Sequence, residues 1–377
     1  MHWIGLDIGG ANIKLADERG TAIQHAFPLW QQPALLAAEL EGLLEGLDSS
    51  AGLAVTMTGE LADCFPDKLA GVEHIVRAAE QAAGQRLLQF YSVAGNWHTT
   101  ADCCDDSSLA SSLAASNWHG LARFASRFQP AYSQLLIDVG STTVDIIPIA
   151  EGSPAARGQT DTERLAAGEL VYCGVRRTPL ATLVDELPWQ GGSIPIARER
   201  FATTHDVYLL TGEIAEEISD LDTADGCPAT IGAAADRLAR MVCACPSEVA
   251  RSAALDMARA VAARQRSLVA SALRQVLASM SQAPQSVIVA GEGGFLAQQV
   301  LEDIGCQATV LCLEEQLGPD LAAVATALAM AAWPRTSSGL VGSSIQSGEN
   351  SARCFMFSMA SATSQTWLAS NMSSRSG

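Results

Sequence analysis

A short pattern occurs twice in this chain, and it restricts the fold more than any other feature of the sequence. Residues 4–9 (IGLDIG) and 135–140 (LLIDVG) each consist of an apolar strand, an aspartate, one apolar residue and a glycine. A small polar turn and a second apolar strand follow each copy, at 13–16 and 144–149. This weak internal repeat predicts two domains that share the same core.

Strand-like and helix-like stretches alternate along the rest of the chain. Apolar runs typical of strands occur at 2–7, 53–57, 87–93, 286–290 and 308–313, and helical spacing at 33–47, 71–84, 111–128, 229–243, 248–281, 294–304 and 320–333. Residues 101–108 are interpreted as a polar loop. The alternation predicts an α/β fold with domains at 1–132 and 133–334. Residues 335–377 are rich in Ser, Gly, Thr and Asn and are predicted to form a disordered tail.

Composition narrows the classes of function. The 377 residues carry a net charge of −18 and are 48% hydrophobic, which is sufficient for a sizeable core. A chain this acidic repels phosphate backbones and anionic lipid, so neither nucleic acid nor membrane is expected as a partner. The cysteines form no CxxC pair, which favours free thiols in a reducing compartment. With no signal segment and no membrane-spanning run evident, we expect a cytoplasmic protein.

Three glycine-bearing turns follow apolar strands. Turn 1 contains Gly9, Gly10, Ala11 and Asn12, turn 2 contains Gly140, Ser141 and Thr142, and turn 3 contains Gly291, Gly293 and Gly294. Glycine lets backbone N–H groups approach a phosphate closely, and hydroxyl or amide side chains add donors. Asp7 ends the strand before turn 1, and Asp138 ends the strand before turn 2. Both are suited to hold a divalent cation. Turn 3 opens a predicted helix, whose N-terminus suits a nucleotide or another anion.

In this order and spacing, the turns resemble the phosphate-1, phosphate-2 and adenosine motifs of the superfamily of acetate and sugar kinases, Hsp70 and actin. The resemblance covers roughly residues 1–333. It implies two ribonuclease-H-like domains of the actin-like ATPase type, with a cleft between them that binds a phosphorylated ligand. Asn12 stands where the kinases usually carry threonine, and Glu292 places a negative charge near a would-be nucleotide. Both departures favour a diphosphate ester over ATP, with Mg²⁺ as the expected cofactor.

A closer resemblance rests on three strings: 56–61 (TMTGEL), 65–68 (FPDK) and 168–179 (GELVYCGVRRTP). They resemble the hydantoinase/oxoprolinase-like branch of the superfamily, and within it the proteins of tetrahydromethanopterin-linked one-carbon transfer and the synthases of methanofuran biosynthesis. That resemblance implies a transferase with two small-molecule substrates. It would join an aminomethylfuran-methyl diphosphate to the phenol of a tyramine-type amine and release diphosphate.

Such a reaction requires neutralisation of the leaving diphosphate and positioning of the phenol oxygen. Candidates for the first task are the amides of turns 1 and 2, a cation near Asp7 and Asp138, and the ammonium of Lys14. Lys14 is one of two lysines among 23 basic residues, and it lies beside turn 1. The preference for Arg elsewhere suggests that an ammonium at this position was selected for its chemistry.

A general base would remove the phenol proton. Glu60 and Asp63, after the strand at 53–57, and Asp145, after turn 2, are the candidates. For Glu60, a helix N-cap or an acid in the first turn of a helix is an equally good interpretation.

Two tryptophans and an arginine are candidates for binding the substrate rings or charges. Asn-Trp-His occurs at 96–98 and again at 117–119. Trp97 and Trp118 can stack on a furan or phenol ring, although packing of the intervening loop is the more common role of tryptophan. Arg176 is assigned to grip a carboxylate or phosphate, and its neighbour Arg177 to the surface or to a salt bridge.

Three rival functions remain open on the sequence. An ATP-dependent small-molecule kinase could use the same fold, and a Mg²⁺-ATPase assay would reveal it. A nucleotide-sensing interaction protein would bind ATP without turnover and hold a partner with residues 335–377. Hydantoinase-type hydrolysis of an amide ring is implied by the broad branch alone.

Overall fold

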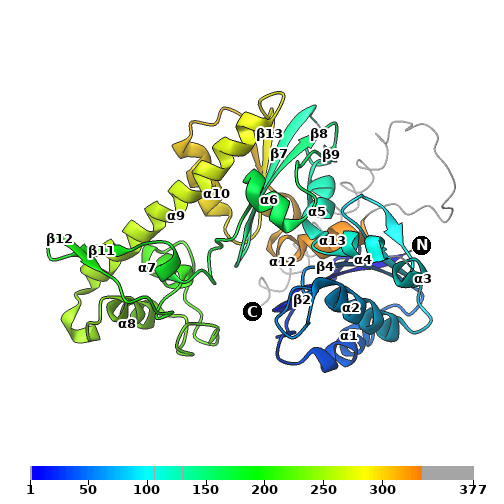
Figure 1. The fold of residues 1–377 in the computed structure, drawn as a ribbon, viewed down its shortest axis with the longest axis horizontal. Helices are drawn as coiled ribbons and strands as arrows, with labels where there is room; N and C mark the ends of the chain where they lie inside the picture. The colour runs from blue at the N-terminus through cyan, green and yellow to red at the C-terminus, as the bar shows by residue number, and fades with distance from the viewer. Residues whose placement is uncertain (1, 106, 130, 333–377) are drawn as a thin grey trace, which may run out of the picture. The chain divides into compact units, whose positions relative to one another are not determined.

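The computed structural model describes residues 2–105, 107–129 and 131–332 (Figure 1). Its first sheet has six strands in the order β3–β2–β1–β4–β5–β6. These strands are β1 (Trp3–Ile8), β2 (Asn12–Asp17), β3 (Ala22–Ala26), β4 (Gly52–Met57), β5 (Leu88–Tyr91) and β6 (Trp97–His98). The first three form an antiparallel meander, whereas β4 and β5 lie parallel to β1 and to each other.

The second sheet repeats this arrangement. Its order is β10–β8–β7–β13–β14, with β9 added beside β8. The strands are β7 (Ser133–Val139), β8 (Val144–Ala150), β9 (Ser153–Pro154), β10 (Leu170–Val171), β13 (Ser286–Ala290) and β14 (Thr309–Cys312). Again the central hairpin is antiparallel, and the next two strands are parallel to its first strand. Two sheets of ribonuclease-H-like order confirm the predicted α/β fold class.

Helices α1 (Leu36–Leu44) and α2 (Lys68–Ala83) pack against the first sheet and bury one core. The side chain of Asp67 caps α2 by accepting a hydrogen bond from the N–H of Ala70. A second core lies under the other sheet, where apolar side chains of α9 (Arg251–Ser279) and α10 (Gly294–Asp303) pack with those of the strands. Each sheet therefore has its own core, as the repeat predicted.

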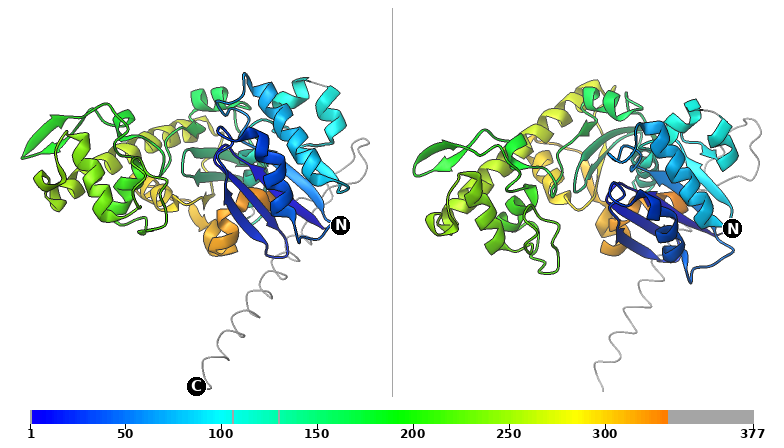
Figure 2. Two further views of the ribbon diagram at one scale, coloured as in Figure 1. Left: turned by 90° about the horizontal axis from the view of Figure 1, so that it is seen from below. Right: turned by 60° about the horizontal axis from the view of Figure 1, so that its bottom comes forward.

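Helix α13 (Ala325–Ala331) returns to the first sheet, although it comes from the segment assigned to the second domain. Figure 2 shows this orange segment beside the blue strands. A methyl group on Gly5 would lie 1.8 Å from the carbonyl oxygen of Ala327, so glycine is what allows β1 and α13 to pack so closely. The last described helix thereby covers the strand that leads into turn 1.

The remaining elements surround this frame. They are α3 (Thr100–Asp105), α4 (Ser107–Leu113), α5 (Asn117–Ala125), α6 (Asp161–Ala167), α7 (Thr204–Thr211), α8 (Ile231–Met241), α11 (Leu313–Leu317), α12 (Pro319–Ala323) and the hairpin of β11 (Glu186–Trp189) and β12 (Gly192–Pro195). No helix in the described ranges is long and apolar enough to cross a membrane.

Three details of the predicted elements are wrong. Residues 101–108 belong largely to α3 and α4 and are not a loop. The helix expected at 111–128 is interrupted around Ala115, whose φ of 47° lies in the left-handed region. The helix expected at 320–333 is divided into α12 and α13 at Val324. The predicted tail at 335–377 lies outside the described residues, and the domain boundaries stay predictions.

Candidate functional site

Turns 1, 2 and 3 meet at one cleft of about 1060 Å³. Most of the residues singled out in the sequence line it: Asp7, Gly9, Gly10, Ala11, Asn12, Lys14, Glu60, Asp63, Asp138, Gly140, Ser141, Thr142, Asp145, Arg176, Gly291 and Gly294. Gly293, Trp97 and Trp118 are not part of this lining. The sheet topology explains why turns 1 and 2 occupy equivalent places at the cleft. Turn 1 connects β1 to β2 in the first sheet, and turn 2 connects β7 to β8 in the second.

Turns 1 and 2 have the same internal geometry. The N–H of Gly9 donates to the carbonyl of Asn12 over 2.9 Å, and the N–H of Gly140 donates to Thr143 over 2.9 Å. Within the described residues, no acceptor is found for the N–H groups of the two positions that follow each glycine. Unpaired backbone donors next to a glycine form an anion-binding nest. Each turn therefore presents free amides, and both turns line the cleft.

Turn 1 is held by two neighbouring segments. Leu29 donates its N–H to the carbonyl of Gly10 over 3.0 Å, and Gly59 donates to Ile8 over 3.1 Å. A methyl group on Gly59 would lie 3.0 Å from the carbonyl carbon of Gly9 and 2.7 Å from the Leu29 side chain. The TMTGEL string thus supplies a glycine that lets the segment before Glu60 pack directly on turn 1.

Turn 2 is held by the GELVYCGVRRTP string. The N–H of Val175 donates to the carbonyl of Gly140 over 3.1 Å, and that of Arg177 donates to Ser141 over 3.0 Å. A methyl group on Gly174 would lie 2.3 Å from the carbonyl carbon of Ser141. The GELVYCGVRRTP string therefore supports turn 2, and a glycine at position 174 permits the close approach.

Turn 3 packs on the end of β7. Gly291 has φ of +82°, and a methyl group there would lie 2.5 Å from the Oδ1 atom of Asp138. Gly293 is buried between Val139 and Val175, and its N–H donates to the carbonyl of Val139 over 2.9 Å. The predicted contact of Gly293 with phosphate is not supported by this placement. Its backbone packs against two valines, and its N–H already donates to Val139. Gly291 and Gly294 do line the cleft.

Lys14 lies directly across the hairpin from Asp7. Burial raises the pKa of Asp7, while the positive charge of Lys14 and a hydrogen bond from Thr326 oppose that rise. The Thr326 hydroxyl donates to Oδ2 over 2.5 Å, whereas Oδ1 is buried without a partner among the described residues. Within those residues the Lys14 ammonium has no carboxylate within 4.0 Å, so it is available to a ligand.

Asp138 faces Asp145 across the equivalent hairpin. Burial, together with the negative charge of Asp145, raises the pKa of Asp138 to about 7. Asp145 forms an ion pair with Arg164, a buried residue of α6 that also contacts Asp161 over 3.3 Å. The Arg164 guanidinium opposes the rise that burial causes in the pKa of Asp145. Because this carboxylate is occupied by Arg164, it is less suited than Glu60 to accept a proton.

Glu60 combines burial with an unpaired oxygen. It is 1% exposed, and its Oε2 atom has no hydrogen-bond partner among the described residues. Burial raises its pKa to about 7, which the positive charge of Lys68 partly opposes. A methyl group on Gly71 of α2 would lie 2.1 Å from the Glu60 carbonyl oxygen, so the helix packs tightly behind it. A carboxylate with a pKa near neutrality in a cleft is suited to general base catalysis.

The two tryptophans lie outside the cleft. Trp97 pairs with Tyr91 at the edge of the first sheet, with the ring centroids 4.9 Å apart. Trp118 is 3% exposed, and the Arg164 guanidinium lies 4.3 Å from its ring centroid. Trp118 therefore supports Arg164 and through it Asp145. Neither tryptophan is placed to stack on a ligand in the cleft, so packing is their role in this structure.

The two arginines of the GELVYCGVRRTP string differ in their partners, and it is Arg176, the one assigned to a ligand, that forms ion pairs within the protein. Arg176 donates to Glu292 over 2.8 Å and to Asp220 over 2.7 Å. Its guanidinium is therefore already neutralised by two carboxylates. Arg177 also lines the cleft, and its guanidinium lies 5.8 Å from the ring centroid of Trp30. This difference was not predictable from two adjacent arginines, because the partners of Arg176 are distant in the chain.

The donors around Asp7 and Asp138 fit a magnesium ion. Mg²⁺ is usually held by one or two carboxylates and completes its shell with water and phosphate oxygens. Asp7 has a buried oxygen for which the described part of the chain supplies no partner, and Asp138 ends the equivalent strand in the same cleft. No group of three or more metal-ligating side chains occurs within the described ranges. The arrangement thus suits an ion that arrives with a phosphorylated ligand better than a permanent structural metal.

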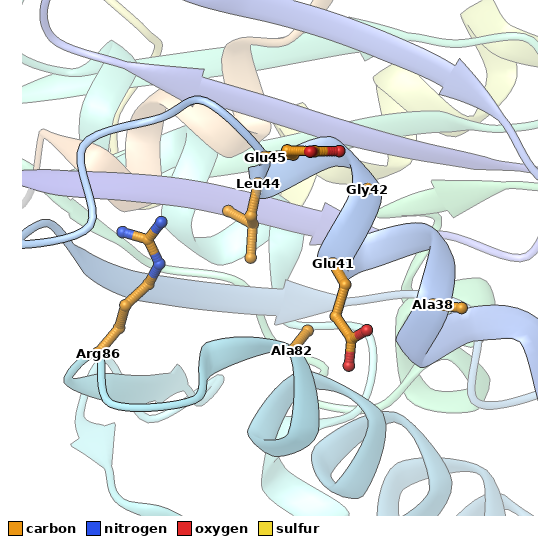
Figure 3. Close-up of a pocket in the computed structure, with 7 residues that line it drawn as sticks. All are labelled: Ala38, Glu41, Gly42, Leu44, Glu45, Ala82 and Arg86. Atoms are coloured by element: carbon orange, nitrogen blue, oxygen red, sulfur yellow. The ribbon is translucent and has the colours of Figure 1, made fainter.

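A second hollow, of about 480 Å³, lies between the ends of α1 and α2 (Figure 3). Its lining is Ala38, Glu41, Gly42, Leu44, Glu45, Ala82 and Arg86. The guanidinium of Arg86 donates to the backbone carbonyl groups of Leu47 and Asp48. Its only cationic side chain is thus occupied, and none of the three turns contributes to it. We therefore place the functional site in the larger cleft.

Two ribonuclease-H-like sheets that each present a glycine turn to a shared cleft define the actin-like class of phosphate-binding folds. The chain belongs to the hydantoinase/oxoprolinase family, whose model matches residues 52–334. It is 31% identical to the (4-{4-[2-(gamma-L-glutamylamino)ethyl]phenoxymethyl}furan-2-yl)methanamine synthase of Methanocaldococcus jannaschii, over 87% of this chain and 96% of that protein. A synthase of the same name from Methanococcus vannielii is 29% identical over 50% of this chain and 84% of its own length.

Solved structures with a similar arrangement are more distant. An acetone carboxylase in its nucleotide-free form is 11% identical with a TM-score of 0.45, over 85% of this chain and 51% of its own. This chain thus spans about half the length of the carboxylase chain. An archaeal actin homologue in complex with ADP is 14% identical with a TM-score of 0.43, over 88% of this chain and 98% of its own.

Proposed function

We propose that this protein is a synthase of methanofuran-type cofactor biosynthesis, in which an aminomethylfuran-methyl group moves from a diphosphate ester to a phenol. The observation that carries the proposal is the combination, in one cleft, of two turns with free amides, an unpaired ammonium and a buried carboxylate with a pKa near 7. The family membership and the named synthases, one of them matched over 96% of its length, support the assignment to methanofuran-type biosynthesis.

The diphosphate would bind across turns 1 and 2. The amides that follow Gly9 and Gly140 would donate to its oxygens, and Lys14 would lie beside them. The bond between the furfuryl carbon and the bridging oxygen breaks, and its electron pair leaves with the diphosphate. Preorganised donors that meet this developing negative charge lower the barrier, because they need no reorganisation during the reaction.

The phenol supplies the new bond. Its oxygen attacks the furfuryl carbon, which the furan oxygen stabilises as the diphosphate departs, and an aryl ether forms. The phenol proton passes to the unpaired Oε2 of Glu60, so that one bond to carbon forms, one breaks and the charge balances. In the cleft Glu60 lies beside Leu61, an exposed apolar side chain that suits contact with a ring.

Asp7 and Asp138 would hold a magnesium ion, which supplies positive charge to the phosphate oxygens when bound. The ion matters here because the lining is rich in carboxylates. A diphosphate ester, which carries up to three negative charges, would be repelled by them without a cation.

The test is a paired assay with purified protein and Mg²⁺. We expect diphosphate release from the aminomethylfuran-methyl diphosphate in the presence of tyramine or γ-glutamyltyramine, with an equal amount of ether product. We expect no release of phosphate from ATP above background. ATP turnover with no ether formation would instead identify a kinase or ATPase and would overturn the proposal. A Lys14→Ala protein serves as the negative control, since contaminating phosphatases would survive that change.

A further inference from the structure

Arg177 and Trp30 form a contact that bridges turns 1 and 2. The guanidinium carbon of Arg177 lies 5.8 Å from the centroid of the indole ring, within the range of a cation–π interaction. The backbone of Arg177 is hydrogen-bonded to Ser141 of turn 2. Trp30 follows Leu29, whose N–H donates to Gly10 of turn 1. The pair therefore joins the two halves of the cleft beside the two sets of free amides.

The charges of the cleft leave two cations without an anionic partner. Eight carboxylates line the cleft: Asp7, Glu60, Asp63, Asp138, Asp145, Asp161, Glu292 and Glu314. Four basic residues line it too, and Arg164 and Arg176 each form ion pairs with two of the protein's own carboxylates. Among the described residues, Lys14 and Arg177 have no carboxylate within 4.0 Å. These two are the cations that a ligand can engage.

The two free cations have neighbours of different exposure. Lys14 faces Asp7, which is 5% exposed, whereas Arg177 lies over Trp30, which is 39% exposed. A diphosphate has two phosphoryl groups and so can meet one cation with each. A guanidinium that rests on an aromatic face keeps its N–H edge free for bidentate contact with phosphate oxygens.

We propose that Arg177, supported by Trp30, binds the outer phosphoryl group of the diphosphate, while Lys14 and the free amides bind the inner one. This subsite rests on the proposed function for the identity of the ligand. It gives Trp30, which the sequence analysis did not single out, the role of supporting a cation at the ligand. It also explains how a cleft lined with eight carboxylates can accept a group with two phosphates.

The experiment measures binding of inorganic diphosphate, inorganic phosphate and tyramine by calorimetry, each in the presence of Mg²⁺. The proteins are the full chain, Arg177→Gln, Arg177→Lys and Trp30→Phe. Arg200→Gln is the matched control, because it removes one exposed guanidinium outside the cleft. We expect Arg177→Gln to weaken diphosphate binding about tenfold or more, since a charge-assisted contact is lost. Phosphate and tyramine binding should change less than about threefold, with Arg177→Lys intermediate.

Trp30 provides a second readout that does not depend on affinity. Diphosphate should change the tryptophan emission of the full chain, because the guanidinium above the indole is drawn to the phosphate. Trp30→Phe should lose that change while its melting temperature stays within about 2 °C, since the ring is partly exposed.

The outcomes separate the two levels of the proposal. If the full chain binds diphosphate and Arg177→Gln binds it equally well, the subsite is wrong and the proposed function stands. If Arg177→Gln loses tyramine affinity instead, Arg177 belongs to the acceptor and the subsite is also wrong. If the full chain binds no diphosphate, the proposed function fails first and the subsite fails with it.

Discussion

Lys14 and Asp145 occupy equivalent positions in the two sheets: Lys14 is paired with Asp7 across β1–β2, and Asp145 with Asp138 across β7–β8. The repeat therefore preserves the aspartate of each turn but reverses the charge of the residue opposite. In the second sheet, Arg164 neutralises Asp145 from α6. In the first, Lys14 itself is paired with Asp7 across the hairpin, and its ammonium has no carboxylate within 4.0 Å among the described residues, so it is available to a ligand. Of these two equivalent positions, the one beside turn 1 therefore carries the positive charge, on Lys14.

Replacement of Lys14 tests that asymmetry. Lys14→Ala should lower kcat by about 10²-fold or more, because a charge that meets the leaving diphosphate is lost. The melting temperature should change little, since Lys14 forms no ion pair among the described residues. Lys14→Arg should restore activity in part, because a wide guanidinium replaces a compact ammonium. The assay is diphosphate release, run beside a thermal melt.

Arg259→Ala is the matched control for this change. Arg259 lies on α9, is 65% exposed and contacts Asp256 over 3.5 Å, so both kcat and the melting temperature should stay near those of the unmodified protein. Near-normal turnover of the Lys14→Ala protein would show that Lys14 is a surface residue. The proposed site would then be wrong at its central residue.

The turns were predictable from the sequence because their determinants are local. A glycine two positions after an aspartate, at the end of an apolar strand, carries its own geometry, and the structure repeats it in both sheets. The partners of the site were not predictable in this way. Thr326 donates to Asp7 from the last described helix, and Arg176 meets Glu292 from turn 3. Contacts between such distant positions leave no pattern in a single sequence.

The polar segment at 101–108 shows a different kind of error. Its Asp and Ser residues suggested a loop, but the segment lies largely in α3 and α4. The side chain of Asp102 accepts from the N–H of Thr99 over 2.7 Å, and the Thr99 hydroxyl accepts from the N–H of Asp102 over 3.4 Å. This reciprocal pair is a capping arrangement with aspartate in the place of glutamate. Polar residues that disfavour a helix interior are the ones that favour its start, and T-x-x-D was the signal available in the sequence.

Substitution of Gly174 tests whether the GELVYCGVRRTP string supports turn 2. Gly174→Ala places a methyl group 2.3 Å from the carbonyl carbon of Ser141, so the turn must move. We expect a loss of about 1–3 kcal/mol in the free energy of unfolding and at least tenfold weaker diphosphate binding. Gly42→Ala is the control, because it lies inside α1 with nothing within 4 Å of the added methyl group. That change should be neutral or stabilise the protein by up to about 1 kcal/mol. Equal diphosphate affinity in both variants would contradict the support role.

Substitution of Trp118 distinguishes a packing role from recognition of a substrate ring. Trp118→Ala should cost about 3–5 kcal/mol, because it removes a buried indole from beneath Arg164. Trp118→Phe should retain most of the stability and leave the KM for the phenolic acceptor within about twofold, and Trp97→Phe should do the same. If either Phe variant raises the KM tenfold without lowering the melting temperature, the tryptophan replaced contacts the substrate and the packing interpretation is wrong.

Glu60 makes a prediction about pH that joins stability and catalysis. Its pKa is raised from 4.5 to about 7, so the folded protein keeps a proton that the unfolded chain has already released between those values. The free energy of unfolding therefore falls as pH rises through this window, and the loss is complete above about pH 7. Glu60→Gln has no such loss. It should be more stable than the unmodified protein by about 3 kcal/mol at pH 8 and by about 1 kcal/mol at pH 5.

The same change should abolish the rise of activity with pH. In the unmodified protein kcat/KM should increase through about pH 7 as Glu60 ionises and becomes able to accept the phenol proton. Glu60→Gln should be at least 10²-fold slower, with the ascending limb lost or moved to the pKa of another group. Urea unfolding curves at pH 5, 6, 7 and 8 and the pH profile of diphosphate release measure the two effects. A stabilised but fully active Glu60→Gln would retain the buried-acid interpretation and exclude Glu60 as the base, whereas a destabilised variant at pH 8 would show that its carboxylate is ionised and satisfied in the folded state.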